Sequence, residues 1–132
     1  MVSEIGGTMK KPTKQTIRRK ADAVLQEYVR LKNKNVLCFL CGNKPVQVGH
    51  HFVYKSQSNS CRYYLSNIIP LCNDCHCLIH AQPSMTNARV CFKMGEEWFR
   101  ELEEEKKKRQ VFTKEWVSFY YELWSKMLEE LK

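Results

Sequence analysis

The chain has 132 residues, of which 43% are hydrophobic and 27% are charged, and this composition excludes wholesale disorder. The length fits one domain with one modest core. The formal net charge of +8 is uneven: residues 1–36 carry +6, residues 37–92 carry +3 and residues 93–132 carry −1. Such a field favours a polyanionic partner, of which nucleic acid is the commonest inside cells, and a merely solvated surface is the alternative.

Hydropathy and cysteine content indicate where in the cell the protein is expected to work and how its cysteines are used. The N-terminus has no apolar stretch that would serve as a signal peptide, and no run approaches the roughly 18 apolar residues of a membrane span. We therefore expect a soluble, cytoplasmic protein with no membrane partner. Seven cysteines, an odd number, argue against a disulfide framework in such a compartment. Metal binding becomes the leading use for at least four of them.

The N-terminal third divides into two segments. Residues 1–12 carry glycine, proline and lysine without periodicity, and we interpret them as a disordered lead. From residue 13 to residue 32, apolar side chains recur at helical spacing, with Arg18, Arg19 and Lys20 among the polar positions. This pattern predicts an amphipathic, basic helix.

The middle of the chain has shorter elements. The stretch "NVLCFLCGNKPVQVGHHFVY" has short apolar runs broken by Gly, Asn and Pro, which is typical of a zinc knuckle that leads into a short strand. The polar residues 55–66 predict an exposed loop. A short helix is expected to start at Asn73 or Asp74, and Gln82-Pro83 ends it because proline disfavours helix in the residue before it.

Two more helices are predicted, over residues 95–108 and 113–131. Glutamates precede lysines or arginine at four-residue spacing in "ELEEEKKKR", which we interpret as a solvated face. The last helix carries a stripe of aromatic and aliphatic side chains on one face: Trp116, Tyr120, Leu123, Trp124, Met127, Leu128 and Leu131. Such a stripe is more often core packing, and the alternative is the face of a homodimer.

Two CxxC pairs form the strongest motif. Cys38 with Cys41 and Cys72 with Cys75 each place two thiolates on a tight turn, and two such turns complete the all-thiolate shell of a structural zinc ion. The remaining cysteines, at positions 61, 77 and 91, have no partner spacing, so packing or no role is assigned to them. We therefore predict a structural Zn²⁺ site.

Thirty residues separate the two pairs, against about fifteen to twenty in ordinary four-cysteine modules. Long intervals inside compact domains tend to be functional. The interval carries His50, His51 and Asn67, and the second pair runs into His76 and His80, which are one helical turn apart. With His50, these two imidazoles would make a second metal site that has open coordination positions. The alternative is a mixed site in which His76 and His80 join one CxxC pair.

The order of His50-His51, Asn67, His76 and His80 resembles the HNH nuclease motif of the ββα-metal fold, in the form found in colicin DNases. The framing CxxC pairs resemble the zinc-stapled branch of that family. A weaker likeness, carried by the basic helix, "GHHFVYK" and the C-terminal tail, is to the phage recombination nucleases of the NinG/Rap type, which cut branched DNA. The chain departs from that group in having Cys-His, where Cys-Asn is expected.

The predicted elements and this resemblance together give an α+β fold. A small ββα-metal core at residues 36–82 with the four-cysteine zinc site would be flanked by the basic helix at 13–32 and the C-terminal helices at 95–131. All of these would belong to a single nuclease domain at 13–132.

The resemblance also implies roles for the site residues. His51 would be the general base that deprotonates a water, and Asn67 would orient His51 through a hydrogen bond across the hairpin loop. His50, His76 and His80 would hold one catalytic divalent ion. Three imidazoles suit Zn²⁺ or Ni²⁺, whereas Mg²⁺ or Mn²⁺ binds substrate phosphate readily. Products with 5′-phosphate and 3′-hydroxyl ends follow from the family mechanism.

The function expected from these features is a metal-dependent DNA endonuclease that acts on branched or flapped DNA, with a phage or bacterial origin. Candidate phosphate contacts are Arg18, Arg19, Lys20, Lys55 and Arg62. The principal alternative is a non-catalytic zinc-binding DNA adaptor. A sequence-specific homing or restriction nuclease is a weaker alternative, because the short chain leaves no room for a separate recognition domain.

Overall fold

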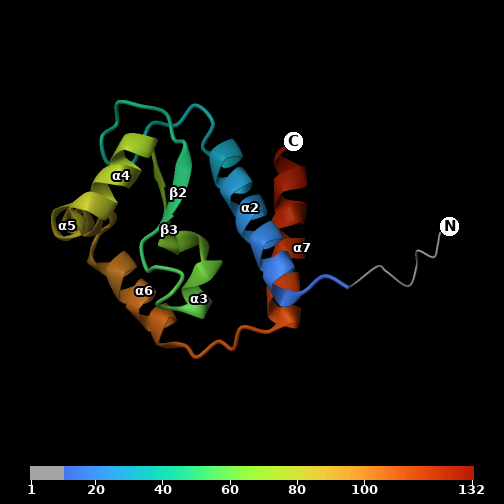
Figure 1. Ribbon diagram of the computed structural model, residues 1–132. Helices are drawn as coiled ribbons and strands as arrows, with labels where there is room; N and C mark the ends of the chain where they lie inside the picture. Colours follow the sequence, from blue (N-terminus) through green and yellow to red (C-terminus); the bar gives the residue numbers. More distant parts are fainter. Residues whose placement is uncertain (1–10) are drawn as a thin grey trace.

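Figure 1 shows the computed structural model of the protein, which describes residues 11–132. The disordered lead expected at residues 1–12 thus lies almost wholly outside the described residues. The first described helix is α2 (Lys14–Lys32), as the apolar periodicity predicts. Its N-cap is Thr13, whose hydroxyl accepts a hydrogen bond of 3.2 Å from the backbone N–H of Thr16, so the start of α2 is set locally.

A two-stranded antiparallel hairpin forms the centre of the fold. Strand β2 (Val48–His51) pairs with β3 (Ile68–Leu71), with His50 opposite Ile69. The hairpin lies between α2 on one side and α4 (Asn73–Ala81) on the other (Figure 1). The position of α4 agrees with the start and end that its sequence predicts.

The segment between the strands differs from the exposed loop that its polar composition predicts. It contains the short helix α3 (Asn59–Arg62) and the 3-10 turn η1 (Leu65–Asn67), and the side chains of residues 61 to 63 are buried. The hydroxyl of Ser58 accepts a hydrogen bond from the backbone N–H of Cys61 at 3.2 Å and caps α3. Local capping by serine and packing against neighbouring helices order this segment in spite of its composition.

Helix α5 (Pro83–Met94) was not predicted from the sequence. Proline at the first position of a helix lacks only an N–H that would have no partner anyway, so Pro83 both ends α4 and begins α5. Gly95, with φ of +98°, separates α5 from α6 (Glu96–Lys107), which confirms the predicted helix at 95–108 to within one residue at each end.

The C-terminal helix α7 (Lys114–Leu131) lies side by side with α2 (Figure 1). Its aromatic stripe packs into a core shared with α2 and the hairpin; Trp124 contacts Tyr28 with ring centroids 5.0 Å apart. The stripe is therefore largely covered within the chain. A homodimer through these helices stays an untested prediction.

A second core lies around the cysteine pairs. It includes Ile69 and Leu71 of β3, Ile79 of α4 and Val90 of α5, each of which is fully or almost fully buried. The fold is α+β, mostly helical with a small two-stranded sheet. None of the helices in the described part of the chain is long and apolar enough to cross a membrane.

Candidate functional site

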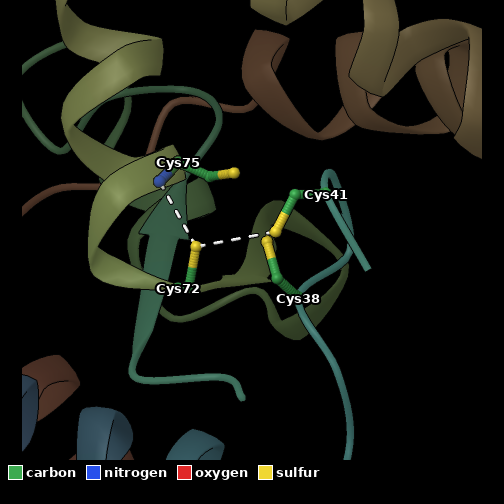
Figure 2. Close-up of side chains that lie close together, drawn as sticks. All are labelled: Cys38, Cys41, Cys72 and Cys75. Atoms are coloured by element: carbon green, nitrogen blue, oxygen red, sulfur yellow. Dashed lines mark hydrogen bonds between the residues drawn. The ribbon is translucent and has the colours of Figure 1, made fainter. Parts of the chain in front are cut away.

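The four cysteines of the two CxxC pairs form one cluster. Cys38 and Cys41 come from the segment before β2, Cys72 caps the N-terminus of α4 and Cys75 lies in its first turn (Figure 2). All four sulfurs lie within 4.8 Å of one another. A tetrahedral zinc ion about 2.3 Å from each sulfur would place the sulfurs about 3.8 Å apart. The Cys41 and Cys72 sulfurs are 3.9 Å apart, which fits that geometry.

Local backbone geometry creates each half of the cluster. Gly42 has φ of +65°, a conformation that glycine adopts without strain, and its N–H donates a 2.9 Å hydrogen bond to the carbonyl of Cys38. Backbone N–H groups also point at sulfur: Asn43 donates to Cys41 and Cys75 donates to Cys72, both at 3.4 Å. N–H donors of this kind stabilise thiolate ligands.

The cluster fits a metal ion chemically as well as geometrically. Burial, and then the neighbouring thiols, raise the pKa of Cys75, whereas burial at Cys38 is outweighed by backbone N–H groups, which lower its pKa to about 6, so the cluster holds thiol and thiolate forms close together. A bound cation supplies a positive counter-charge and keeps coordinating thiols deprotonated. The four-cysteine cluster could thus hold a structural metal such as zinc.

Three histidines form a second, separate cluster. His50 comes from β2, whereas His76 and His80 lie one turn apart on α4, and one ring nitrogen of each lies within 4.8 Å of the others. The Nε2 atoms of His76 and His80 are 3.2 Å apart, and the ring centroid of His50 is 5.2 Å from that of each. The mixed site of one CxxC pair with His76 and His80 is wrong, since the cysteines group with one another instead.

The His50 side chain is suited to ligating a cation. It is 2% exposed, and its Nε2 is buried without a hydrogen-bond partner among the described residues. Burial, and then the charges of His76 and His80, lower the pKa of His50 to about 3, so the imidazole is neutral near pH 7. A buried nitrogen lone pair facing two further imidazoles fits a divalent metal ion.

His51 follows His50 and is held differently. Its Nε2 lies 2.9 Å from the carbonyl oxygen of Arg62, and because a carbonyl only accepts, Nε2 carries the proton. Nδ1 is then the nitrogen with a free lone pair. Burial lowers the pKa of His51 to about 4 although the carbonyl bond opposes the shift, so this lone pair is available near neutral pH.

Asn67 does not make the hydrogen bond to His51 that we expected. Its side-chain oxygen accepts from the N–H of Val53 at 2.7 Å, and its nitrogen donates to the carbonyls of Val53 and Cys61 at 3.0 and 3.1 Å. Asn67 is fully buried and ties the start of the loop to α3. The hydrogen-bond partner of His51 is the backbone carbonyl of Arg62 instead, so the expected role of Asn67 in orienting His51 has no direct contact behind it.

These histidines surround a cavity of about 300 Å³. Its lining consists of Gln26, Val48, Gly49, His50, His51, Tyr54, Lys55, His76 and His80. Sequence reasoning missed Gln26, whose amide makes two hydrogen bonds of 2.7 and 2.9 Å with the backbone of Gly49. No local signal marks Gln26, because only the docking of α2 on β2 brings it there. Tyr54, also missed, has its ring beside those of His50 and His80.

The five candidate phosphate contacts have different environments. Arg19 and Lys20 are exposed on α2, Arg18 is half-buried and Lys55 is exposed at the cavity. Arg62 is not the exposed loop residue that we expected: its side chain is 8% exposed and bonded to Asp22. The structure thus brings Lys55 to the histidines and makes Arg62 part of the interior.

Comparison of the chain with protein-family models, with curated proteins and with solved structures gave no match. The geometry of the two clusters therefore carries the functional argument.

Proposed function

We propose that the protein is a metal-dependent DNA endonuclease that hydrolyses phosphodiester bonds in the manner of the HNH nucleases. The observation that carries this proposal is the cavity in which the three clustered histidines, His50, His76 and His80, lie beside His51. A pure binding module has no need of a buried imidazole with a free lone pair next to three others.

The three clustered histidines would hold one divalent ion, Mg²⁺, Mn²⁺, Zn²⁺ or Ni²⁺. The positive charge of such an ion would stabilise the negative charge that develops in the transition state on a phosphate oxygen and on the departing 3′ oxygen. The four-cysteine cluster has no open position of this kind, and its role would be structural.

His51 would act as the general base. With Nε2 donating to the Arg62 carbonyl, Nδ1 accepts the proton of a water that attacks the phosphorus. The carbonyl then stabilises the imidazolium that forms, because it remains hydrogen-bonded to Nε2–H. Lys55, at the edge of the same cavity, is placed to contact a phosphate of the substrate.

The preferred substrate would be branched or flapped DNA in recombination of the phage type. This part of the proposal rests on the order of motifs along the chain and on the basic character of α2. The cavity is lined by residues of α2, β2 and α4, and we expect a backbone displaced from a regular duplex to reach it more easily than one within a duplex.

The test is a cleavage assay on matched labelled linear duplex, 5′ flap, 3′ flap and four-way junction, with and without Mg²⁺ or Mn²⁺. Wild type should cut branched DNA only with metal, and His51→Ala should reduce the rate by about 100- to 10,000-fold while zinc content and circular dichroism persist. Cutting by His51→Ala at the wild-type rate would refute the mechanism. Binding of these DNAs without any cutting would support the zinc-binding adaptor instead.

A further inference from the structure

A second cavity lies beside the histidine cavity, and Lys55 lines both of them. Its volume is about 620 Å³, within the range of sites that take ligands of nucleotide size. It is formed by Lys14, Gln15, Arg18, Asp22, Lys55, Ser56, Asn59, Arg62 and Phe112. Four of these side chains are basic and one is acidic, so the cavity as a whole is cationic.

The basic side chains of this cavity are not equivalent. Asp22 accepts two hydrogen bonds from Arg62, at 3.1 and 2.6 Å, so this guanidinium is already neutralised by a fixed partner. Lys55 lies 3.9 Å from the same carboxylate, beyond hydrogen-bonding distance. Within residues 11–132, Lys14 and Arg18 form no ion pair. Lys14 and Arg18 are therefore free to bind an anion, whereas Lys55 has only a long ion pair with Asp22, which an anion in the cavity would compete with.

Arg18 carries a more specific signal. Its Nε is buried and has no hydrogen-bond partner within the described part of the chain. A buried donor without an acceptor is unfavourable, so the Arg18 guanidinium would gain a charge-assisted bond by turning toward an anionic oxygen in the cavity.

The apolar part of the cavity lining is the side chain of Phe112, which lies beside two of the cations. The Lys14 Nζ lies 5.6 Å from the centroid of the Phe112 ring, and the guanidinium carbon of Arg62 lies 5.5 Å from the same centroid. Cation–π contacts of this kind orient a lysine without neutralising it. An apolar wall also strengthens the attraction between the remaining charges and an anion.

We propose that this cavity binds a backbone phosphate of the DNA, next to the phosphate that is cut at the histidines. Lys14 and Arg18 hold the phosphate, Lys55 connects the two sites, and Arg62 with Asp22 forms the rigid floor. The inference rests on the proposed nuclease function for its substrate. Binding of this second phosphate would determine which phosphodiester linkage of the strand lies next to His51.

Binding measurements test the site without the need for cutting. The parent protein for these measurements is full-length His51→Ala, and the double variant Lys14→Gln with Arg18→Gln made in it is called the cavity pair. The affinity of each protein for a fluorescent flapped DNA is measured by anisotropy over a series of salt concentrations. The matched control is Arg30→Gln with Lys34→Gln, which removes two exposed charges from the other end of the same helix and the turn after it.

The cavity pair should weaken binding at least about tenfold and make the slope of log K against log salt shallower by about 2, since two phosphate contacts are lost. The control pair should stay within about twofold of its parent. Thermal denaturation shows that both pairs remain folded. Equal losses for the two pairs would overturn the proposal, because they would reflect the general positive field alone.

A second measurement locates the phosphate. Single uncharged methylphosphonate linkages are placed one at a time along the DNA strand, and each DNA is bound to the parent and to the cavity pair. One linkage should weaken binding to the parent but not to the cavity pair; the absence of such a position would overturn the site.

The two proposals fail separately. If the cavity pair binds DNA more weakly than the control pair, but the protein with His51 intact cuts no DNA, the phosphate site is supported and the nuclease function is refuted. If the protein cuts DNA only with metal, but the cavity pair and the control pair bind DNA equally well, the nuclease function is supported and the phosphate site is refuted.

Discussion

Nε2 of His51 donates a hydrogen bond of 2.9 Å to the backbone carbonyl of Arg62. The side chain of Arg62 is itself fixed, because Asp22 of α2 accepts two hydrogen bonds from it. An ion pair between α2 and α3 thus determines where the carbonyl lies and, through it, the tautomer of His51.

Asp22→Asn should therefore affect both stability and cutting. The substitution leaves the buried Arg62 guanidinium without a counter-charge, and we expect a loss of about 3 kcal/mol in the free energy of unfolding. Urea denaturation measures this loss. At a temperature where the variant is folded, the cutting rate should also fall, because His51 is less well held. Glu104→Gln, which removes an exposed partner of Lys107, is the control and should change neither quantity measurably.

Zinc retention should depend on Cys75 and not on its neighbour Cys77. Cys75→Ser removes one of the four clustered sulfurs and should release the metal, whereas Cys77, two residues further on the same helix, is exposed and outside the cluster. Elemental analysis of the dialysed proteins gives the zinc content. Zinc loss from Cys77→Ser equal to that from Cys75→Ser would contradict the assigned ligand set.

The histidine cluster should bind a second metal independently of the first. His80→Ala should weaken Ni²⁺ binding, measured by equilibrium dialysis of zinc-loaded protein, by more than about 100-fold, because even changes outside the ligand shell cost 10- to 100-fold. His51→Ala should leave Ni²⁺ affinity close to that of wild type. Equal effects of the two variants would show that the cluster is not a distinct metal site.

Gly49→Ala should destabilise the contact between α2 and the hairpin. An added Cβ would lie 2.6 Å from Cγ2 of Ile68 in β3 and 3.2 Å from Cγ1 of Val29 in α2, so the Ile68 side chain must shift and α2 must give way slightly. We expect a loss of about 1 to 3 kcal/mol on urea denaturation. In a double-mutant cycle, Gly49→Ala with Ile68→Ala should lose less than the sum of the single losses. If the losses of the two single variants add exactly, the contact between residue 49 and Ile68 is not the reason that glycine is required at this position.

Much of the secondary structure followed from local pattern. The 3.6-residue periodicity predicted α2 and α7, the CxxC pairs predicted the cysteine cluster, and Gln82-Pro83 predicted the end of α4. The prediction failed where burial came from distant partners. Helix α5 was missed because its buried face is narrow, and α3 was mistaken for an exposed loop because its sequence is polar.

The histidine site was likewise predictable only in part. Spacing along one helix already placed His76 and His80 on the same face, since positions four apart lie one turn from each other. Spacing could not show that β2 brings His50 to them, nor that Asn67 bonds to the backbone of Val53 and Cys61 and not to His51.

The sequence by itself determined which residues are able to ligate a metal and where α2, α4, α6 and α7 form, because ligand type, turn geometry and hydrophobic periodicity are local properties. Only the tertiary structure decided that Arg62 is a buried partner of Asp22, that its carbonyl fixes the proton on His51, and that Lys55 borders two cavities. These relationships join α2, the hairpin and α3 across long stretches of chain. They depend on packing and desolvation, which no short stretch of sequence contains.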